Sequence, residues 1–512
     1  MPMHNHFHNS RALITAVRSF FLHLAFFIAL LLLAPATQGQ VLKAKWVEES
    51  ELRIEEIRKA DLRIIIIDKE GNPVARCPVH IEQVQHAFRW GVRLPRELPE
   101  ELLPTREQIK AAPLWRSFSG IALDAHTQWP ITQPDRGKWD FGSVEKQLAF
   151  ARERGLSARW GSVVSTDPGR MPGWAAGLKG DELRAALEAH TKEVVSRFGK
   201  QVDQLDVVTQ MIDHRFIEKE LGFAAVRRLY QLNDYERERS TNPVNASSSL
   251  ARSMLAFDDA FAPARLQKAL RQVTAFREGF VPFDGMAIEV RFTGSLVEAP
   301  ITRNLEWLGD PGIPVTVVNL EVSGDSKADA AVNLETALRA MFSQPCVEGI
   351  YFAGLRSRDL QNEDAALMED DGTLTPSGEL VDRMVRQHWW TDVTAAADDL
   401  GNVRQRVFAG AYRISASLPD GSAADVHVRI SPGQSRLVLM QPIKAKPADA
   451  QVADADKHKE PGTPSEGEVL IKPVIDGAIV PVKEENKRSS SSSDSSAVPI
   501  PGRSRLEFMP ER

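Results

Sequence analysis

The chain has 512 residues, of which 43% are hydrophobic and 26% are charged, and its formal net charge is −6. This length is enough for one large core with smaller modules attached to it. Binding to phosphate backbones requires concentrated Lys and Arg, whereas this chain has a mildly acidic balance and no basic run. We therefore expect no nucleic-acid partner.

The N-terminal segment has the composition of a secretory signal peptide. Arg11 and Arg18 precede the apolar run FFLHLAFFIALLLLA, and small residues follow it. The alternative is an uncleaved membrane anchor, but the run is shorter than the ~18 apolar residues of a typical span and contains His23. We predict that residues 1–39 are removed, that the protein is secreted or lies in the periplasm or cell envelope, and that no stable membrane span remains.

Residues 40–87 are expected to form a helix followed by a small β-module. Two β-rich runs flank the turn sequence KEGNP at 69–73, which predicts a hairpin. The chain has only two cysteines, Cys77 and Cys346, and an exported protein with so few is not a disulfide scaffold. The two either pair or remain as buried free thiols, and we favour free thiols.

Between residues 88 and 390, short apolar runs alternate with longer amphipathic segments whose apolar residues recur at three and four. Candidate strands fall at 88–92, 118–124, 156–164, 204–210, 283–292, 315–322 and 349–354. This alternation predicts an α/β fold, a (β/α)8 TIM barrel with small β-modules before and after it. An open doubly wound sheet is the alternative, but no G-x-G-x-x-G motif follows the first strand.

The fifth strand of this barrel has no clear candidate. The segment at 232–253 is polar and rich in turn residues. Either a brief strand lies at about 232–235, or this corner of the barrel carries a disordered insertion.

The chain changes in character after the barrel. Residues 391–443 alternate apolar and polar side chains around Asp420-Gly421, which predicts a second small β-module. Residues 444–512 are rich in Pro, Ala, Glu, Lys and Ser, and they are expected to form a disordered tail because this composition buries little apolar surface.

Four stretches within the barrel region carry a family resemblance. They are TQWPITQPDRGKWDF at 127–141, DVV at 206–208, VTVVNLEVS at 315–323 and VEGIYFAGL at 347–355. In order and spacing they resemble glycoside hydrolase family 10, the endo-1,4-β-xylanases. The resemblance implies a protein of carbohydrate metabolism whose partner is a polysaccharide such as xylan or another β-glycan. No cofactor is expected, and the scattered histidines lack the spacing of metal ligands, so we expect no metal.

The resemblance breaks at the positions of the chemistry. The family hydrolyses glycosides with retention, using one carboxyl group as the acid/base and another as the nucleophile. The acid/base position of the family's D-V-V-N-E motif falls on Gln210, and the nucleophile position of T-E-L-D falls on Asn319. Both positions therefore carry neutral amides, and loss of general acid catalysis alone costs about 10²- to 10⁴-fold in rate.

The sugar-binding positions also depart from the family pattern. The family's E-N-E-M-K-W falls on DAHTQW at 124–129, and its Q-x-H falls on Glu289-Val290-Arg291. Trp160 belongs either to the cleft wall or to the core. The substrate-binding candidates are His126, Gln128, Trp129, Trp160, Thr209 and Arg291.

These substitutions leave two main hypotheses. In the first, the protein is a glycan-binding pseudoenzyme on a reused barrel. In the second, it is an active retaining endo-1,4-β-xylanase-like glycosidase with displaced carboxylates. Strand parity places Asn319 and Glu321 on one face, so Glu321 could approach Glu289 on the neighbouring strand, with Asp124 and Asp213 as further carboxylates. A third option is a structural surface protein whose barrel only spaces two β-modules.

Overall fold

The computed structural model describes residues 45–96, 104–105, 108, 112–240 and 251–442 of the chain. The predicted signal peptide at 1–39 and the predicted tail at 444–512 lie outside these residues. Among the residues that the structure describes, no helix has the length and apolarity needed to cross a membrane.

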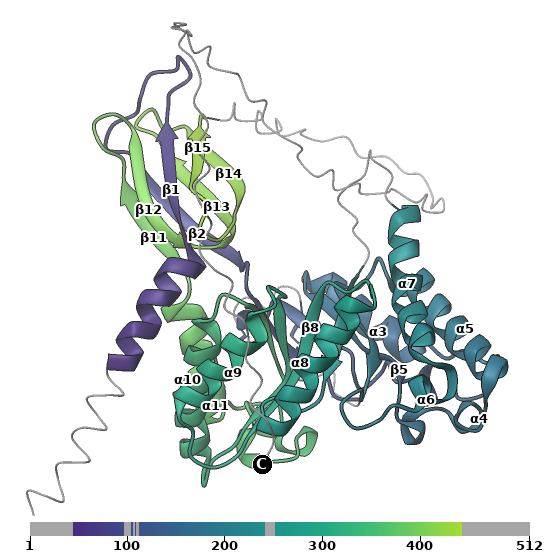
Figure 1. The fold of residues 1–512 in the computed structure, drawn as a ribbon. Coiled ribbons are helices and arrows are strands. Elements are labelled where there is room, and N and C mark those ends of the chain that lie inside the picture. The colour runs from purple at the N-terminus through teal and green to yellow at the C-terminus, as the bar shows by residue number, and fades with distance from the viewer. Residues whose placement is uncertain (1–44, 97–103, 106–107, 109–111, 241–250, 443–512) are drawn as a thin grey trace, which may run out of the picture. The chain divides into compact units, whose positions relative to one another are not determined.

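The central feature is a closed barrel of eight parallel strands in the order β10-β3-β4-β5-β6-β7-β8-β9 (Figure 1). This confirms the predicted TIM barrel. Each strand is short and apolar, as expected for a sheet whose two faces are both covered. The strands are β3 (Arg89–Arg93), β4 (Gly120–Ala122), β5 (Ser157–Ser165), β6 (Gln204–Thr209), β7 (Arg252–Phe257), β8 (Gly285–Phe292), β9 (Val315–Val322) and β10 (Val347–Phe352).

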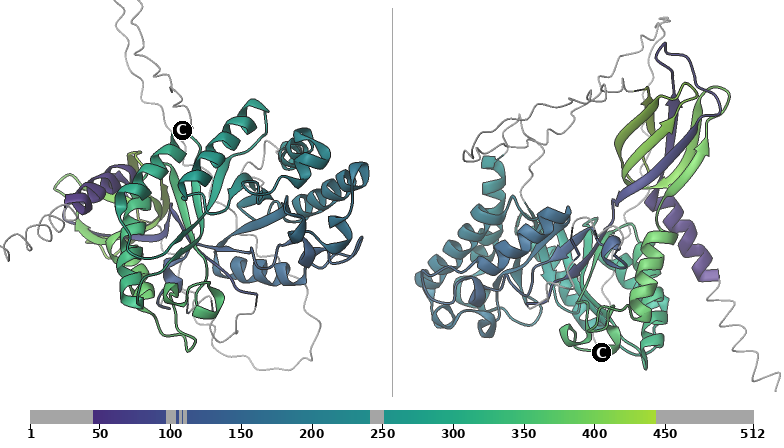
Figure 2. Two further views of the ribbon diagram at one scale, coloured as in Figure 1. Left: turned by 60° about the horizontal axis from the view of Figure 1, so that its bottom comes forward. Right: turned by 180° about the vertical axis from the view of Figure 1, so that it is seen from behind.

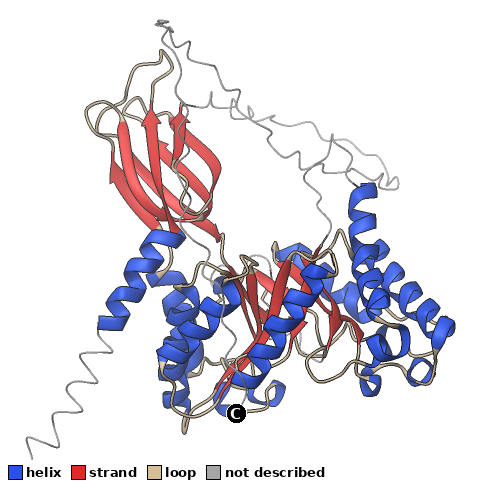
Figure 3. Ribbon diagram, in the orientation of Figure 1, coloured by secondary structure: helices blue, strands red, loops and turns tan. Residues whose placement is uncertain are grey.

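Amphipathic helices surround the barrel strands (Figure 3). In α5 (Gly180–Phe198), for example, the buried residues include Leu183, Leu187, Val194 and Phe198, whose spacing places them on one face. The other described helices of at least eight residues that follow the first barrel strand are α3 (Gly142–Arg154), α7 (Phe223–Ser240), α8 (Pro263–Glu278), α9 (Glu298–Gly309), α10 (Lys327–Phe342) and α11 (Pro376–Arg383).

The fifth barrel strand is β7 (Arg252–Phe257), and the predicted brief strand at 232–235 is wrong. Those residues belong to α7, which buries Leu229, Tyr230 and Leu232 against the barrel. The strand contains the apolar run SMLAF, which directly follows a polar segment. Its hydrophobic pattern therefore does not stand out in the sequence. The other alternative, an insertion, falls largely on residues 241–250, which lie outside the described residues.

The β-segments on either side of the barrel share one core. One sheet has the order β12-β1-β15, and the other has the order β11-β2-β13-β14. In Figure 2 the purple N-terminal strands lie among the green and yellow C-terminal strands. The strands are β1 (Lys59–Ile66), β2 (Pro78–His86), β11 (Asp392–Ala396), β12 (Asn402–Phe408), β13 (Gly410–Ser417), β14 (Ala423–Ile430) and β15 (Arg436–Met440).

The predicted hairpin around residues 69–73 is present only beside the turn, where Ile67 and Pro73 form an antiparallel bridge and the Val74 N–H donates a hydrogen bond of 3.0 Å to the Ile66 carbonyl oxygen. The turn itself is present, because the Asp68 carboxyl accepts hydrogen bonds from the backbone N–H groups of Glu70 and Asn72. However, β1 and β2 pair in different sheets, since the chain crosses the shared core after the turn. That core contains Leu62, Ile81 and Tyr412 among its buried residues.

The helix at 45–58 connects to the barrel through Arg58. The buried guanidinium donates hydrogen bonds to the carbonyl oxygens of Phe342, Gln344 and Val347 at 2.8, 2.6 and 2.8 Å. Burial lowers the pKa of Arg58 to about 10, so the side chain stays charged at neutral pH. These contacts lie where β10 begins, the end of the barrel that usually serves stability and not chemistry.

Candidate functional site

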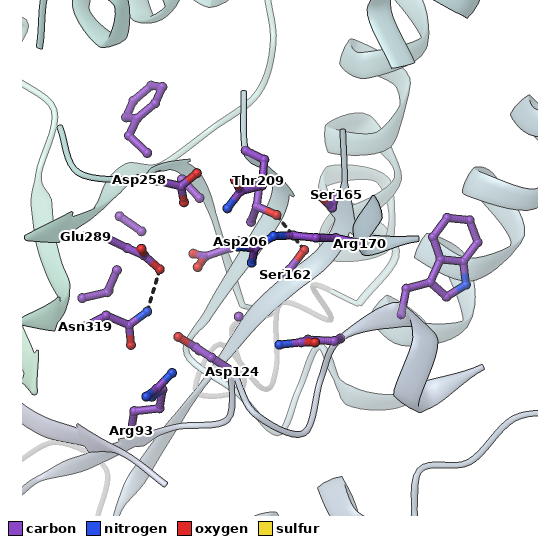
Figure 4. A pocket seen from close by; sticks show the side chains of 18 residues that line it. Arg93, Asp124, Ser162, Ser165, Arg170, Asp206, Thr209, Asp258, Glu289 and Asn319 are labelled. Carbon is purple, nitrogen blue, oxygen red and sulfur yellow. Dashed lines mark hydrogen bonds between the residues drawn. The ribbon is translucent and has the colours of Figure 1, made fainter. Parts of the chain in front are cut away.

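A cavity of about 120 Å³ lies at the C-terminal ends of the barrel strands. This is the end of a TIM barrel at which active sites are built. Charged and amide side chains from several different strands point into it (Figure 4). The site can therefore be described strand by strand.

Glu289 on β8 and Asn319 on β9 form a direct pair. The Asn319 Nδ2 donates a hydrogen bond of 2.7 Å to Glu289 Oε1. Burial raises the pKa of Glu289, the hydrogen bond from Asn319 opposes this rise, and the charge of Asp124 adds to it. The Asn319 Oδ1 is buried and has no hydrogen-bond partner among the described residues. The pair thus contributes one carboxyl group to the cavity and contains one buried acceptor without a donor among the described residues.

Asp258 follows β7 and supplies a second carboxyl group on the same side of the cavity (Figure 4). Burial raises the pKa of Asp258 to about 7, with a further contribution from the negative charge of Glu289, while Arg170 and Arg265 oppose the rise. Within the described part of the chain, its carboxyl oxygens have no ion-pair partner within 4.0 Å. Near neutral pH, this group therefore exchanges a proton readily.

Arg159 on β5 holds the opposite side of the site together. It is fully buried, and it donates hydrogen bonds of 2.6 Å to both carboxyl oxygens of Asp206 and of 3.3 Å to Asp124 Oδ1. Burial opposes its charge, but the two carboxylates keep the pKa of Arg159 above its ordinary value. A Cβ at Gly161 would lie 2.5 Å from Asp124 Oδ1, so glycine leaves room for this carboxyl group.

The two amides that the sequence predicts at the family's catalytic positions, Gln210 and Asn319, both line the cavity. Gln210 directly follows β6, and Asn319 lies within β9. Both have left-handed backbones, with φ of 65° and 49°. Such conformations are uncommon outside glycine and concentrate at functional sites. Thr209, next to Gln210, also lines the cavity, and its hydroxyl lies 2.8 Å from the Ser162 hydroxyl.

Glu321 and Arg291 lie outside this lining. Glu321 is buried and accepts hydrogen bonds from the Asn362 backbone N–H at 2.7 Å and from its side-chain amide at 2.8 Å. The Arg291 Nε lies 3.8 Å from Glu321 Oε2. The positive φ of Asn319 interrupts the alternation of β9, so Glu321 does not follow Asn319 into the cavity.

The aromatic candidates differ in their roles. Trp129 lines the cavity, but one face of its ring stacks on His190 with the ring centroids 4.7 Å apart. Trp160 is fully buried and packs against Phe198 with the ring centroids 5.1 Å apart, so it belongs to the core. Of the two aromatic candidates, Trp129 therefore borders the cavity and Trp160 does not.

The polar candidates before Trp129 are also separated. Gln128 lines the cavity. His126 is buried, its Nδ1 lies 2.6 Å from the Ser143 hydroxyl, and its Nε2 lies 3.1 Å from the Pro95 carbonyl oxygen. Burial lowers the pKa of His126, which favours the neutral ring. His126 thus braces the loop and does not reach the cavity.

Sequence reasoning missed Asp258 and Arg159. Asp258 was overlooked because its strand was not recognised, although a carboxylate at the end of a barrel strand is a typical site residue. Arg159 stands inside an apolar strand, and a charged residue in such a position signals a buried partner, here Asp206. In the described part of the chain, no group of three His, Cys, Asp or Glu side chains is placed to hold a metal.

The barrel fold agrees with the comparison to known families. The profile of glycosyl hydrolase family 10 matches residues 100–371. The chain belongs to glycosyl hydrolase family 10. This confirms the resemblance that the four sequence stretches predicted.

Several relatives of this family 10 protein share low identity over long stretches. The anti-sigma-I factor RsgI6 of Acetivibrio thermocellus is 23% identical over 394 residues, which cover 77% of this chain and 49% of that protein. Endo-1,4-beta-xylanase 2 of Arabidopsis thaliana is 21% identical over 299 residues, which cover 58% of this chain and 27% of the relative. The chain thus spans half or less of the length of these two relatives.

Among solved structures, xylanase 10B from Thermotoga petrophila RKU-1 in complex with xylobiose is similar, with a TM-score of 0.49 and 19% identity. The match covers 59% of this chain and 95% of that chain. Xylanase 10B from Thermotoga maritima has the same TM-score and identity.

Proposed function

We propose that this family 10 protein binds a β-linked glycan at the mouth of its barrel and does not cleave it by the family's retaining mechanism. One observation carries the proposal. Gln210 and Asn319, at the two positions where the family has its acid/base and nucleophile, both line the cavity as neutral amides. An amide can position a sugar hydroxyl, but it neither donates a proton as an acid nor forms a glycosyl ester.

The interactions of Asn319 support this interpretation. Its Nδ2 donates a hydrogen bond to Glu289, so the side chain at the predicted nucleophile position is held in place by a cavity carboxyl group. The polar lining matches the hydroxyl groups of a saccharide, which both donate and accept hydrogen bonds.

Two assays together test this proposal. Isothermal titration calorimetry with xylohexaose and other soluble β-glycan oligosaccharides should detect binding with one site per chain. The same preparations should release no reducing ends during prolonged incubation. Absence of heat with every glycan would contradict the binding proposal, and release of reducing ends would contradict the loss of hydrolysis.

The second candidate function is hydrolysis by displaced carboxyl groups, and the raised pKa of Asp258 to about 7 favours it. A carboxylic acid that is still protonated near neutral pH can serve as a general acid, and Glu289 lies on the neighbouring strand. Asp258 takes the place that the sequence suggested for Glu321, because Glu321 is bound to Asn362 outside the cavity.

This second candidate makes a distinct prediction for three variants. If displaced hydrolysis occurs, Asp258→Asn and Glu289→Gln should each abolish the release of reducing ends. Glu321→Gln is the control, because it removes a buried carboxylate that does not line the cavity. Equal activity in all three variants would contradict a role for the cavity carboxylates.

We also propose that the protein is exported, from the signal-like composition of residues 1–39. Mass spectrometry of the N-terminus after expression in a secreting host should show loss of these residues. An intact N-terminus that fractionates with membranes would instead support the anchor alternative.

A further inference from the structure

The two sides of the cavity differ in how their charges are compensated. On the β5 and β6 side, Arg159 binds Asp206 and Asp124 directly. On the β7 and β8 side, Asp258 and Glu289 have no Lys, Arg or His nitrogen within 4.0 Å among the described residues. The second side therefore has no direct ion pair in the described part of the chain, and Arg170 and Arg265 act on Asp258, and Arg291 and Arg93 on Glu289, only at longer range.

The nearby guanidinium groups make their closest polar contacts with other groups, although Arg93 and Arg170 both line the same cavity. Arg93 donates hydrogen bonds of 2.6 and 3.0 Å to the carbonyl oxygens of Ala353 and Asp359. The remaining arginines near this side have carboxylate partners of their own. They are Arg170 beside Asp167, Arg265 beside Asp213, and Arg291 beside Glu321.

An unused acceptor lies beside these carboxyl groups. The buried Asn319 Oδ1 has no donor within the described structure, while its Nδ2 is engaged by Glu289. Figure 4 shows Asn319, Glu289 and Asp258 on one side of the cavity. A buried oxygen without a donor costs free energy, so this side of the cavity is polar but incompletely satisfied.

We propose that the glycan bound at this site carries free primary amines, as in a β-1,4-linked oligomer of glucosamine units. The inference rests on the proposed function and names the class of glycan. A protonated amine has three donors and one positive charge, so it can approach Asp258 and Glu289 and donate to their carboxylate oxygens. A neutral xylose unit, or an N-acetylated unit, supplies no compensating charge.

The pH dependence follows from the same groups. Asp258 has a pKa of about 7, so below this pH it must lose a proton before it can pair with an ammonium group. Binding of the amine should therefore weaken as the pH falls from about 7.5 to about 6. Protonation of the ligand amine changes in the opposite direction, because a lower pH favours the ammonium form. Loss of affinity at low pH would thus report the protein carboxyl groups.

The test uses isothermal titration calorimetry on the full chain with three tetrasaccharides, namely the glucosamine oligomer, its fully N-acetylated form and xylotetraose. At about pH 7.5 we expect the glucosamine oligomer to bind roughly tenfold to a hundredfold more tightly than the other two, as for a charge-assisted contact. Asp258→Asn should remove most of this preference. Asp259→Asn is the matched control, because it removes an adjacent, exposed carboxylate that does not line the cavity.

The outcomes separate the two proposals. Equal or tighter binding of a neutral oligosaccharide would overturn the amine inference and leave the glycan-binding proposal standing. No binding of any of the three, together with no binding of other β-glycans, would overturn both. An equal loss in Asp258→Asn and Asp259→Asn would indicate general attraction of a cation to an acidic protein, and it would also overturn the inference. Thermal melts of both variants establish that they are folded.

Discussion

Replacing Asp258 with asparagine should stabilise the protein, and it should do so increasingly as the pH rises. Asparagine keeps the size of the side chain and removes its ability to ionise. The Asp258 carboxyl lies beside Glu289 in the cavity and lacks an ion-pair partner within the described residues, so ionisation of Asp258 is unfavourable in the folded state. The variant removes this unfavourable ionisation.

The magnitude follows from the change in pKa on folding. The pKa of Asp258 rises from its ordinary 3.8 to about 7. At ~1.4 kcal/mol per pKa unit, this difference corresponds to an upper bound of about 4 kcal/mol. Because the carboxyl remains partly accessible to solvent, we expect about 1–2 kcal/mol.

The sign follows from proton binding. Well below pH 3.8, Asp258 is protonated in both states, and it has no pH-dependent effect on stability. Between pH 3.8 and about 7, the unfolded chain releases the proton while the folded protein keeps it. The folded wild type therefore loses stability relative to the variant as the pH rises, and the difference is complete above about pH 7.

Urea denaturation at about pH 5 and about pH 8 measures this effect. The free energy of unfolding of Asp258→Asn should exceed that of the wild type at the higher pH, and the excess should be smaller at the lower pH. Asp259 is exposed, so the free energy of unfolding of Asp259→Asn should match that of the wild type at both pH values. A pH-independent difference in the free energy of unfolding, or a variant that is less stable than the wild type at about pH 8, would refute the claim that ionisation of Asp258 destabilises the folded protein.

Three further substitutions probe the neighbouring contacts. Arg159→Met should lower the free energy of unfolding by about 3–5 kcal/mol because Asp206 is left buried and unpaired, and adding Asp206→Leu should recover much of the loss. Asn319→Asp should cost about 2 kcal/mol near pH 8 and less near pH 5, because it removes a donor to Glu289 and adds a like charge. Glu321→Gln should cost about 1 kcal/mol in urea denaturation and leave glycan affinity in calorimetry unchanged. A change in affinity with this variant would place Glu321 in the site after all.

The family barrel was largely predictable because it depends on local patterns. Strands such as β9 are apolar runs of fixed length, and helices such as α5 bury residues at spacings of three and four. The strand that failed, β7, is short and adjoins a polar segment, so its pattern does not stand out. The turn around residues 69–73 was predicted correctly, because it depends on neighbouring residues. The pairing of β2, the strand after the turn, was not predicted, because β2 pairs with strands that are distant in the sequence.

The state of the two cysteines was also predictable from the sequence. Their number and separation in the chain argued against a disulfide scaffold. Cys77 and Cys346 are both free thiols in the structure, which confirms the preferred alternative. Burial raises the pKa of Cys346 to about 11, so this thiol stays protonated and unreactive near neutral pH.

The sequence by itself determined the family and the barrel, and it predicted the two amides at the catalytic positions, because these depend on residue type and order along the chain. Only the tertiary structure decided which carboxyl groups share the cavity. It placed Glu321 on Asn362, paired Glu289 with Asn319 and brought Asp258 beside them. The physical reason is that a positive φ at one residue redirects the side chains of a strand, and strand parity alone does not reveal such a change.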